Sequence, residues 1–233
     1  MQAEKIKFLL DLFFPIECMG CQTQGYFVCE TCANSCMDAA ELSCPSCKLK
    51  SPVGSTHPGC QTPHLLDGIF APLSYKNPLT KSAVKNLKYK NVRKLSVALA
   101  NILGQKIMEN FADYVKNNRF AILPVPLHEK RQKYRGYNQS ELIAQELAKI
   151  LHLECRNLLV RSRETKDQTK LARHERFENV TGAFALKGGE GVRGKNFILV
   201  DDVSTTGATL IEAGKALKRK GAGIVWGMAV AKD

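Results

Sequence analysis

The sequence predicts an α/β protein with a mostly parallel sheet flanked by helices, preceded by a small N-terminal metal-binding domain. Eight of the nine cysteines lie within the first 60 residues, which marks a separate module. After a stretch rich in Pro, Gly and His at 51–64, segments typical of strands and of helices alternate along the chain. A chain of 233 residues accommodates one ordinary domain and one smaller domain. We therefore expect domains at 1–64 and 65–233.

The overall composition is that of a globular protein, with 44% hydrophobic and 24% charged residues. The apolar segment FLLDLFF (8–14) is short and is interrupted by Asp11, so it predicts neither a membrane span nor a signal peptide. We expect a cytoplasmic protein that does not insert into a membrane.

The net charge of +12 is distributed unevenly along the chain. Residues 1–65 contain four lysines and six acidic residues, so the remaining chain carries 30 of the 34 basic residues. A strongly basic body favours polyanionic partners such as nucleic acid, phosphorylated metabolites or an acidic membrane surface. Solubility alone is the alternative explanation for this charge.

The N-terminal cysteines are arranged in pairs with the spacing of zinc knuckles. Because no secretory signal precedes them, metal binding is favoured over disulfides. The simplest partition places four residues on each of two Zn²⁺ ions, the first group being Cys18, Cys21, Cys29 and Cys32 and the second Cys44, Cys47, His57 and Cys60. An interleaved pairing or a single occupied site fits the same spacing, and Cys36 could replace one of these ligands. Cys155 is expected to be a core thiol.

The predicted zinc is structural. A segment this short has too little apolar area to fold unaided, and zinc coordination contributes about 10–16 kcal/mol of apparent binding energy. No His and Glu arrangement leaves the open coordination position that a catalytic zinc needs. The module is net acidic, which makes it a poor electrostatic clamp for DNA. We expect it to pack against the body or to contact another protein.

The rest of the chain predicts the elements of the α/β domain. Residues 83–115 show helical spacing and indicate one or two helices, and FAILPVP (120–126) indicates a buried strand. NQSELIAQELAKIL (138–151) is an amphipathic helix in which Asn138 and Glu141 are placed for a capping box. Strands at 196–200 and 222–231 flank a helix at 209–221. Ligands of such sheets bind beyond the carboxyl ends of the strands.

The segment LVDDVSTTGATL (199–210) indicates a site for a sugar phosphate. Its turn at 204–209 offers hydroxyls, backbone N–H groups and a helix N-terminus to one anion. The adjacent carboxylates of Asp201 and Asp202 need hydroxyl donors or a cation, and a sugar supplies the hydroxyls. An NTPase is the competing interpretation, with GEGVRGKN (189–196) as its phosphate loop. It fails because Asn196 replaces the required Ser or Thr and because the segment precedes a strand.

This segment resembles the motif for 5-phosphoribosyl 1-pyrophosphate (PRPP) of type I phosphoribosyltransferases. The resemblance implies that Asp201 and Asp202 bind the ribose 2′ and 3′ hydroxyls. It also implies that the turn cradles the 5′-phosphate through Ser204, Thr205, Thr206, Gly207, Ala208 and Thr209.

The pyrophosphate of PRPP requires further cations. Arg131 and Arg135, in a basic loop after the strand at 120–126, are the first candidates, with Mg²⁺ expected to share the charge. In phosphoribosyltransferases a flexible loop before the PRPP strand closes over the reacting centre. The corresponding stretch here is 161–176, which adds Gln168, Lys170, Arg173 and Arg176 as candidates. The same residues could instead contact a DNA backbone. A solvated loop is the alternative for both segments.

The whole chain resembles the ComF family of competence-associated phosphoribosyltransferase-like proteins. RGYNQSELIA (135–144), KDQTKLARHERFENVTGAF (166–184) and LKYKN (87–91) carry the likeness, together with the cysteine module. One departure is His57, where the family more often has cysteine. The family implies a role in natural transformation, with single-stranded DNA and other DNA-uptake proteins as partners.

Two functions are therefore predicted. The first is a competence protein that binds PRPP and handles single-stranded DNA on the cytoplasmic side. The second is an active enzyme that transfers phosphoribose to an unknown acceptor with release of pyrophosphate, although no acceptor pocket is evident in the sequence. Basic and aromatic residues suited to DNA phosphates and bases are Lys85, Lys88, Tyr89, Lys90, Arg93, Lys94, Tyr134 and Tyr137. The alternative is a solvated helix face with tyrosines partly in the core.

Overall fold

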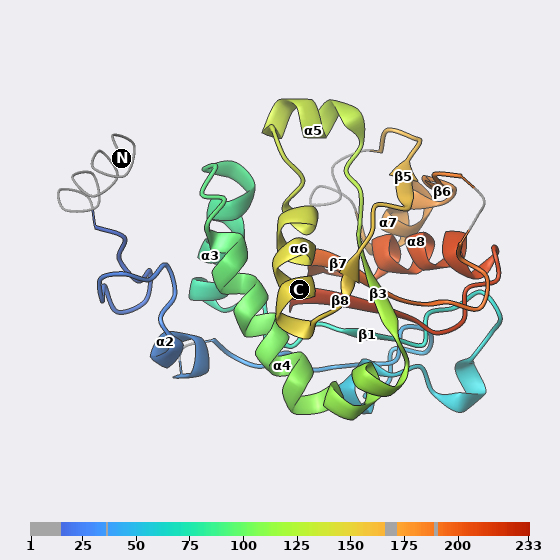
Figure 1. Ribbon diagram of the computed structural model, residues 1–233, viewed down its shortest axis with the longest axis horizontal. Helices are drawn as coiled ribbons and strands as arrows, with labels where there is room; N and C mark the ends of the chain where they lie inside the picture. Colours follow the sequence, from blue (N-terminus) through green and yellow to red (C-terminus); the bar gives the residue numbers. More distant parts are fainter. Residues whose placement is uncertain (1–14, 36, 166–171, 189–190) are drawn as a thin grey trace.

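The core of the protein is a parallel β-sheet with helices on both faces, as the sequence predicts (Figure 1). The computed structural model describes residues 15–35, 37–165, 172–188 and 191–233. The strands run in the order β1-β8-β7-β3-β4, and β2 pairs with the end of β8. Their bounds are Gly68–Phe70 for β1, Leu73–Ser74 for β2, Phe120–Pro124 for β3, Glu154–Cys155 for β4, Asn196–Ser204 for β7 and Val225–Lys232 for β8.

The central strand β7 shows why both faces must be covered. Phe197 and Leu199 point to one face and Ile198 and Val200 to the other, and all four are fully buried. The second pair packs against α3 (Pro78–Tyr89), α4 (Leu95–Asn117) and α6 (Gln139–Leu151). The first pair packs against α8 (Ala208–Lys218). A strand buried on both faces reads as a continuous apolar run, which is the pattern of FILV.

The helices predicted within 83–115 and 138–151 are present as α3, α4 and α6. Asn138 caps α6 by accepting a hydrogen bond from the Ser140 N–H at 3.1 Å. The predicted capping box is wrong, because Asn138 bonds the N–H of Ser140 and not that of Glu141, whose carboxylate accepts a hydrogen bond from Asn157. Among the described residues, no helix is both long and apolar enough to cross a membrane.

Three segments differ from the elements predicted for them. Strand β7 continues four residues beyond the predicted 196–200, so both aspartates belong to the strand. The predicted basic loop after β3 forms the helix α5 (Glu129–Arg135), which His128 caps through its Nδ1. A short antiparallel ladder pairs β5 (Leu159–Arg161) with β6 (Phe184–Leu186), and α7 (Arg173–Val180) lies between these strands in the sequence.

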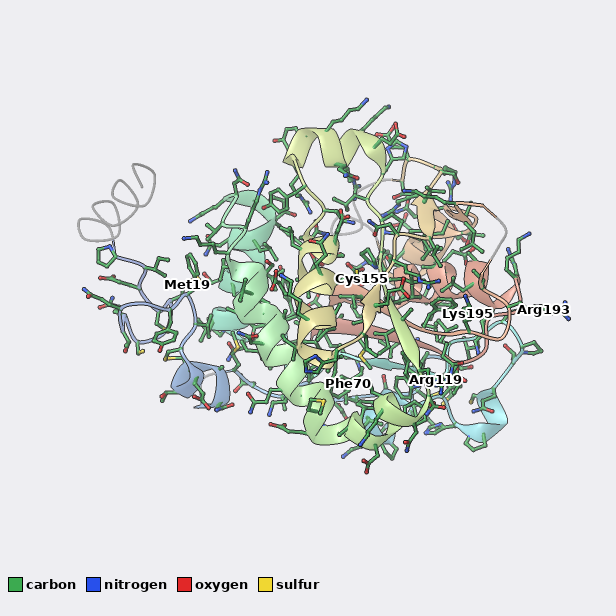
Figure 2. The ribbon with its side chains drawn as sticks, viewed as in Figure 1. Met19, Phe70, Arg119, Cys155, Arg193 and Lys195 are labelled. Carbon is green, nitrogen blue, oxygen red and sulfur yellow. The ribbon has the colours of Figure 1, made fainter. Side chains whose placement is uncertain are left out.

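The N-terminal module has little regular structure: α2 (Glu30–Ser35) and the 3₁₀ turns η1 (Pro52–Gly54) and η2 (Pro58–Cys60). Isolated bridges join Ala39 to Leu73 and Ser55 to Gly68, so the module continues the edge of the sheet. Its first part lies beside α3, where Met19 accepts hydrogen bonds at Sδ from Ser82 and Asn86 (Figure 2).

Candidate functional site

A cavity of about 380 Å³ opens at the carboxyl ends of β3 and β7, beside the last turns of α3. We call it the edge cavity. It brings together residues that the sequence predicts for the sugar, the pyrophosphate and the DNA. Those lining it are Lys85, Lys88, Tyr89, Arg131, Arg135, Asp201, Asp202, Thr205 and Thr209. The structure does not support the NTPase interpretation. Arg193 and Lys195, in the segment considered as its phosphate loop, lie near the amino end of β7, whereas the edge cavity is at the carboxyl end (Figure 2).

The two aspartates at the floor of the edge cavity are held in different ways. Asp201 accepts hydrogen bonds at Oδ1 from the Ser140 hydroxyl at 2.8 Å and from the Asp202 N–H at 2.9 Å. Asp202 is 3% exposed and its Oδ1 lies 2.9 Å from the Lys88 Nζ. The other oxygen of Asp202 is buried without a hydrogen-bond partner. A buried acceptor without a donor is costly, so a ligand hydroxyl that reached this oxygen would stabilise the site.

The paired carboxylates raise the pKa of Asp201. Burial is the largest cause and repulsion from Asp202 adds to it, while Lys88 and the Ser140 hydroxyl act in the opposite direction. The resulting pKa of Asp201 is about 6. Asp201 is therefore mainly ionised at neutral pH and becomes protonated under mildly acidic conditions.

The turn after β7 forms a small hollow at the N-terminus of α8. It is lined by Ser204, Thr205, Gly207, Ala208 and Thr209, as well as by Asp201 and Val203. Gly207 has φ of 80°, and a Cβ there would lie 2.8 Å from Ile69, so glycine is required at this point of the turn. N–H groups at a helix start bind anions, and Thr205 and Thr209 of this turn also line the edge cavity, so the turn is a candidate contact for one phosphate group there.

Thr206 is the member of the predicted phosphate turn that does not line this hollow. It is 8% exposed, and its hydroxyl accepts a hydrogen bond from the Ala208 N–H at 3.3 Å. Its carbonyl accepts a hydrogen bond from Lys48 of the N-terminal module at 3.3 Å. Thr206 thus shapes the turn and joins it to the module.

The two predicted arginines line the edge cavity from α5. Arg131 donates from Nη2 to the Thr165 carbonyl at 3.0 Å. Arg135 bonds Gln139, and its guanidinium lies 5.5 Å from the centre of the Tyr89 ring. Planar guanidinium groups bind phosphate oxygens in pairs, so these side chains suit a pyrophosphate.

Arg161 also lines the edge cavity, and the sequence analysis does not single it out. Only 8% of Arg161 is exposed, its guanidinium lies 5.3 Å from the centre of the Phe184 ring, and its buried Nε has no hydrogen-bond partner. Burial, followed by repulsion from Arg131, lowers the pKa of Arg161 to about 10, so the group remains charged at neutral pH. Arg161 ends β5 and is the first residue of the predicted closing loop 161–176, and this position is the signal in the sequence that points to it.

The predicted closing loop is described only in part. Gln168 and Lys170 lie outside the described residues, and Arg173 begins α7. Arg176 lines the edge cavity and also a neighbouring one. This neighbouring cavity, of about 420 Å³, lies between the N-terminal module and the phosphate turn, and we call it the module cavity.

Two lysines connect the walls of the module cavity. Lys48 contacts Thr206 and lies 5.8 Å from the centre of the Phe177 ring. Lys232, at the end of β8, donates to the Glu41 carbonyl at 2.6 Å and to the Ser43 hydroxyl at 2.9 Å. The N-terminal module therefore forms part of the wall beside the candidate phosphate site.

The residues predicted for DNA binding fall into three groups. Tyr134 is 94% exposed and Tyr89 64% exposed, while Lys85, Lys90, Arg93 and Lys94 are exposed around them. Lys88 instead faces the edge cavity and pairs with Asp202. Tyr137 is buried and donates a hydrogen bond to the Leu87 carbonyl, so its ring is not available to a base.

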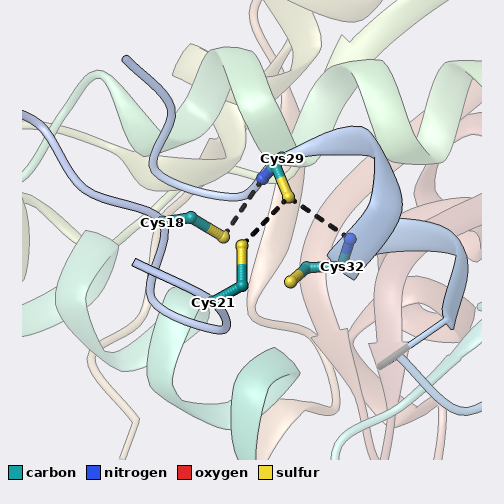
Figure 3. A group of neighbouring side chains, drawn as sticks. All are labelled: Cys18, Cys21, Cys29 and Cys32. Carbon is teal, nitrogen blue, oxygen red and sulfur yellow. Dashed lines mark hydrogen bonds between the residues drawn. The ribbon is translucent and has the colours of Figure 1, made fainter. Parts of the chain in front are cut away.

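The cysteine module brings together the two groups of ligands given by the simplest sequence partition. Cys18, Cys21, Cys29 and Cys32 form the first group, and their sulfur atoms all lie within 4.8 Å of one another (Figure 3). The second group, with Cys44, Cys47, His57 and Cys60, meets the same limit. Cys36 lies outside the described residues, and Cys155 is half-buried in β4.

The donor atoms of both groups fit a tetrahedral metal. The sulfurs of Cys21 and Cys29 lie 3.5 Å apart, close to the edge of about 3.8 Å expected for zinc–sulfur bonds of about 2.3 Å. Burial opposes ionisation of Cys18, but N–H groups of Cys21, Cys29 and Gly20 lower its pKa to about 6. The pKa of Cys44 is likewise lowered to about 7, by N–H donors that outweigh its burial. Thiolates are the form that binds metal.

Comparisons with known proteins agree with the resemblances seen in the sequence. Residues 138–231 match the family described as "Phosphoribosyl transferase domain". The chain is 31% identical over 205 residues to "DNA utilization protein YhgH" of Escherichia coli, covering 85% of this chain and 87% of that protein. It is 30% identical to "Competence protein F" of Haemophilus influenzae, covering 91% and 89% of the two chains. Identity to "Competence protein ComFC" of Bacillus subtilis is 26%, over 83% and 79%.

Proposed function

The chain belongs to the competence protein F family, and we propose that it is a competence protein that binds PRPP in the edge cavity. The observation that supports this most strongly is the arrangement of three groups around one cavity. Asp201 and Asp202 line it from β7, Thr205 and Thr209 of the hydroxyl-rich turn line it as well, and Arg131 and Arg135 line it from α5. The pentose, its 5′-phosphate and its pyrophosphate require groups of these three kinds.

The roles proposed for the residues follow from their chemistry. Asp201 and Asp202 accept hydrogen bonds from the ribose hydroxyls, and the turn receives the 5′-phosphate. Arg131, Arg135 and Arg161 surround the pyrophosphate, together with Mg²⁺ and with Gln168, Lys170 and Arg173 from the loop. Zn²⁺ is structural in both cysteine groups of the proposed domain 1–64, which stabilises the wall beside the proposed domain 65–233.

The test is calorimetric titration with PRPP, with and without Mg²⁺. Asp201→Asn and Asp202→Asn should each weaken binding at least about tenfold, because each removes a charged acceptor for a sugar hydroxyl. The metal content of the cysteine module should stay unchanged, which reports that the variants are folded. Equal affinity of wild type and both variants would contradict the assignment.

We also propose that the exposed basic and aromatic residues of α3, α5 and the segment after α3, which we call the basic face, handle single-stranded DNA on the cytoplasmic side. The exposed rings of Tyr89 and Tyr134 can stack on bases while Lys85, Lys90, Arg93 and Lys94 contact phosphates. Binding should weaken steeply with salt, and Tyr134→Ala should weaken it by about fivefold or more. Tyr26, 57% exposed on the cysteine module, offers the control substitution Tyr26→Ala. Salt-independent binding, or equal losses in both variants, would argue against this face.

The module cavity favours a second candidate function, transfer of phosphoribose to an acceptor. It adjoins the edge cavity, because Arg176, Thr205 and Asp233 line both, and it has space for a small molecule. The enzyme would release pyrophosphate from PRPP when the acceptor attacks C1 of the ribose. Measuring pyrophosphate release with PRPP, Mg²⁺ and candidate acceptors separates this enzyme from a protein that only binds PRPP.

A further inference from the structure

Lys88 is a partly buried cation that lines the candidate site. It belongs to the LKYKN segment, and the neighbouring Leu87 and Val84 anchor this turn of α3 in the core at 0% exposure. The Lys88 side chain is 19% exposed and ends 2.9 Å from Asp202, whose side chain is 4% exposed. Lys85, one turn earlier, lines the same cavity but is exposed. The two lysines therefore stand in different environments on one helix face.

The ammonium of Lys88 stays charged in this position. Burial alone would lower the pKa of Lys88, but attraction to Asp202 and the hydrogen bond to it outweigh burial and raise the pKa. Asp201 adds a second attraction. One positive charge thus faces two negative ones, which reduces the repulsion between the neighbouring carboxylates.

An acid pair of this kind is otherwise a site for a divalent cation. Mg²⁺ binds carboxylate oxygens at about 2.0–2.1 Å and keeps several waters in octahedral positions. An ammonium within hydrogen-bond distance of the same Asp202 oxygen occupies one of these positions and repels a second cation. The Lys88 side chain arises from a regular helix, so it is part of the fold and is present before any ligand binds.

We propose that Lys88 is a built-in counter-cation that orients Asp202 for the sugar hydroxyls and keeps divalent cations away from the acid pair. Lys88 is a positioning residue that acts through Asp202. The role in ligand binding rests on the function proposed above, with Mg²⁺ needed only at the pyrophosphate. The exclusion of divalent cations is a property of the free protein and can be tested by itself.

The first experiment measures Mn²⁺ binding to the full, zinc-loaded chain without sugar, by electron paramagnetic resonance. Lys88→Met should create a Mn²⁺ site that wild type and Lys85→Met lack, and Lys88→Arg, which keeps the charge, should lack it as well. Adding Asp202→Asn to Lys88→Met should abolish the site. Zinc content and the unfolding temperature show whether each variant is folded. If Lys88→Met does not fold, Lys88→Gln is used in its place. An absence of a new Mn²⁺ site in the folded neutral variant, or an equal site in wild type, would overturn the inference.

The second experiment titrates the chain with ribose 5-phosphate, which has the diol and the phosphate but no pyrophosphate. Wild-type affinity should change less than about twofold when Mg²⁺ is added, whereas Lys88→Met should lose about tenfold and recover part of it with Mg²⁺. A wild type that binds neither ribose 5-phosphate nor PRPP would reject the proposed function, and the Mn²⁺ result would still decide the role of Lys88. Unchanged affinity in Lys88→Met would reject its role in orienting Asp202.

Discussion

The two metal-ligand groups of the N-terminal module differ in what they contact. The first group lies beside α3, where Met19 accepts hydrogen bonds from Ser82 and Asn86. The second group carries Lys48 one residue after Cys47, and this lysine reaches the carbonyl of Thr206. Two chemically similar groups thus have different relations to the site, since one supports a helix and the other supports a wall of the candidate phosphate site.

The local backbone explains how the second group fixes Lys48. The Lys48 N–H bonds the Cys44 carbonyl at 3.1 Å, and Lys48 has φ of 65°, a left-handed conformation that non-glycine residues seldom adopt. Metal coordination by Cys44 and Cys47 would hold this turn in place. On the other side, Lys232 bonds Glu41 and Ser43, so contacts run in both directions between module and sheet.

The largest expected effect separates the two groups directly. Cys21→Ser and Cys47→Ser are matched substitutions, because each removes the exposed second cysteine of a knuckle. Each should lose one metal ion, measured by elemental analysis. Cys47→Ser should also weaken PRPP binding by about thirtyfold through loss of Lys48 and the cavity wall, whereas Cys21→Ser should change it less than about threefold. Equal losses of affinity would remove the distinction between the groups.

The next effect is the pH dependence of PRPP binding, which arises from Asp201 at the carboxyl end of β7. It should be independent of both metal-ligand groups. The pKa of Asp201 is raised to about 6, mainly by burial, so the free folded chain holds a proton that the unfolded chain releases at lower pH. Its ionisation therefore reduces stability as pH rises toward about 6, while a hydroxyl ligand favours the ionised form. PRPP affinity should fall about tenfold between about pH 7 and pH 5.

Calorimetry across this range checks the prediction, with pyrophosphate titrated in parallel to account for ionisation of the ligand. Asp201→Asn should abolish most of the pH dependence that remains after this correction. Cys21→Ser should retain it, because the first group contacts α3 at Ser82 and Asn86, whereas Asp201 is held by Ser140 and Asp202. A pH dependence that persists in Asp201→Asn would assign the proton to another residue.

The parts of the molecule that were predictable from the sequence are those fixed by local spacing. The cysteine pairs define the two ligand groups, and the run FILV followed by Asp201 and Asp202 defines the central strand and its acids. The contacts that distinguish the two groups were not predictable, because Lys48 and Thr206 are 158 residues apart. The Lys88–Asp202 pair and the position of Arg161 likewise depend on how α3 and β5 pack. The sequence prediction therefore assigned Lys88 to DNA binding by its charge, whereas the structure pairs it with Asp202 in the edge cavity.

The smallest effect tests the two contacts without removing a metal ligand. Lys48→Ala removes one lysine contact with the phosphate turn and should weaken PRPP binding by about threefold to tenfold, with full metal content. Met19→Ala is the matched substitution in the first group, and it should lower the free energy of unfolding by about 1 kcal/mol because Met19 is half-buried against α3. It should leave PRPP affinity unchanged. Calorimetry measures the affinity of both variants for PRPP, and thermal unfolding measures their stability. Reduced affinity in Met19→Ala would mean that the first group affects Lys88 and Asp202 through α3.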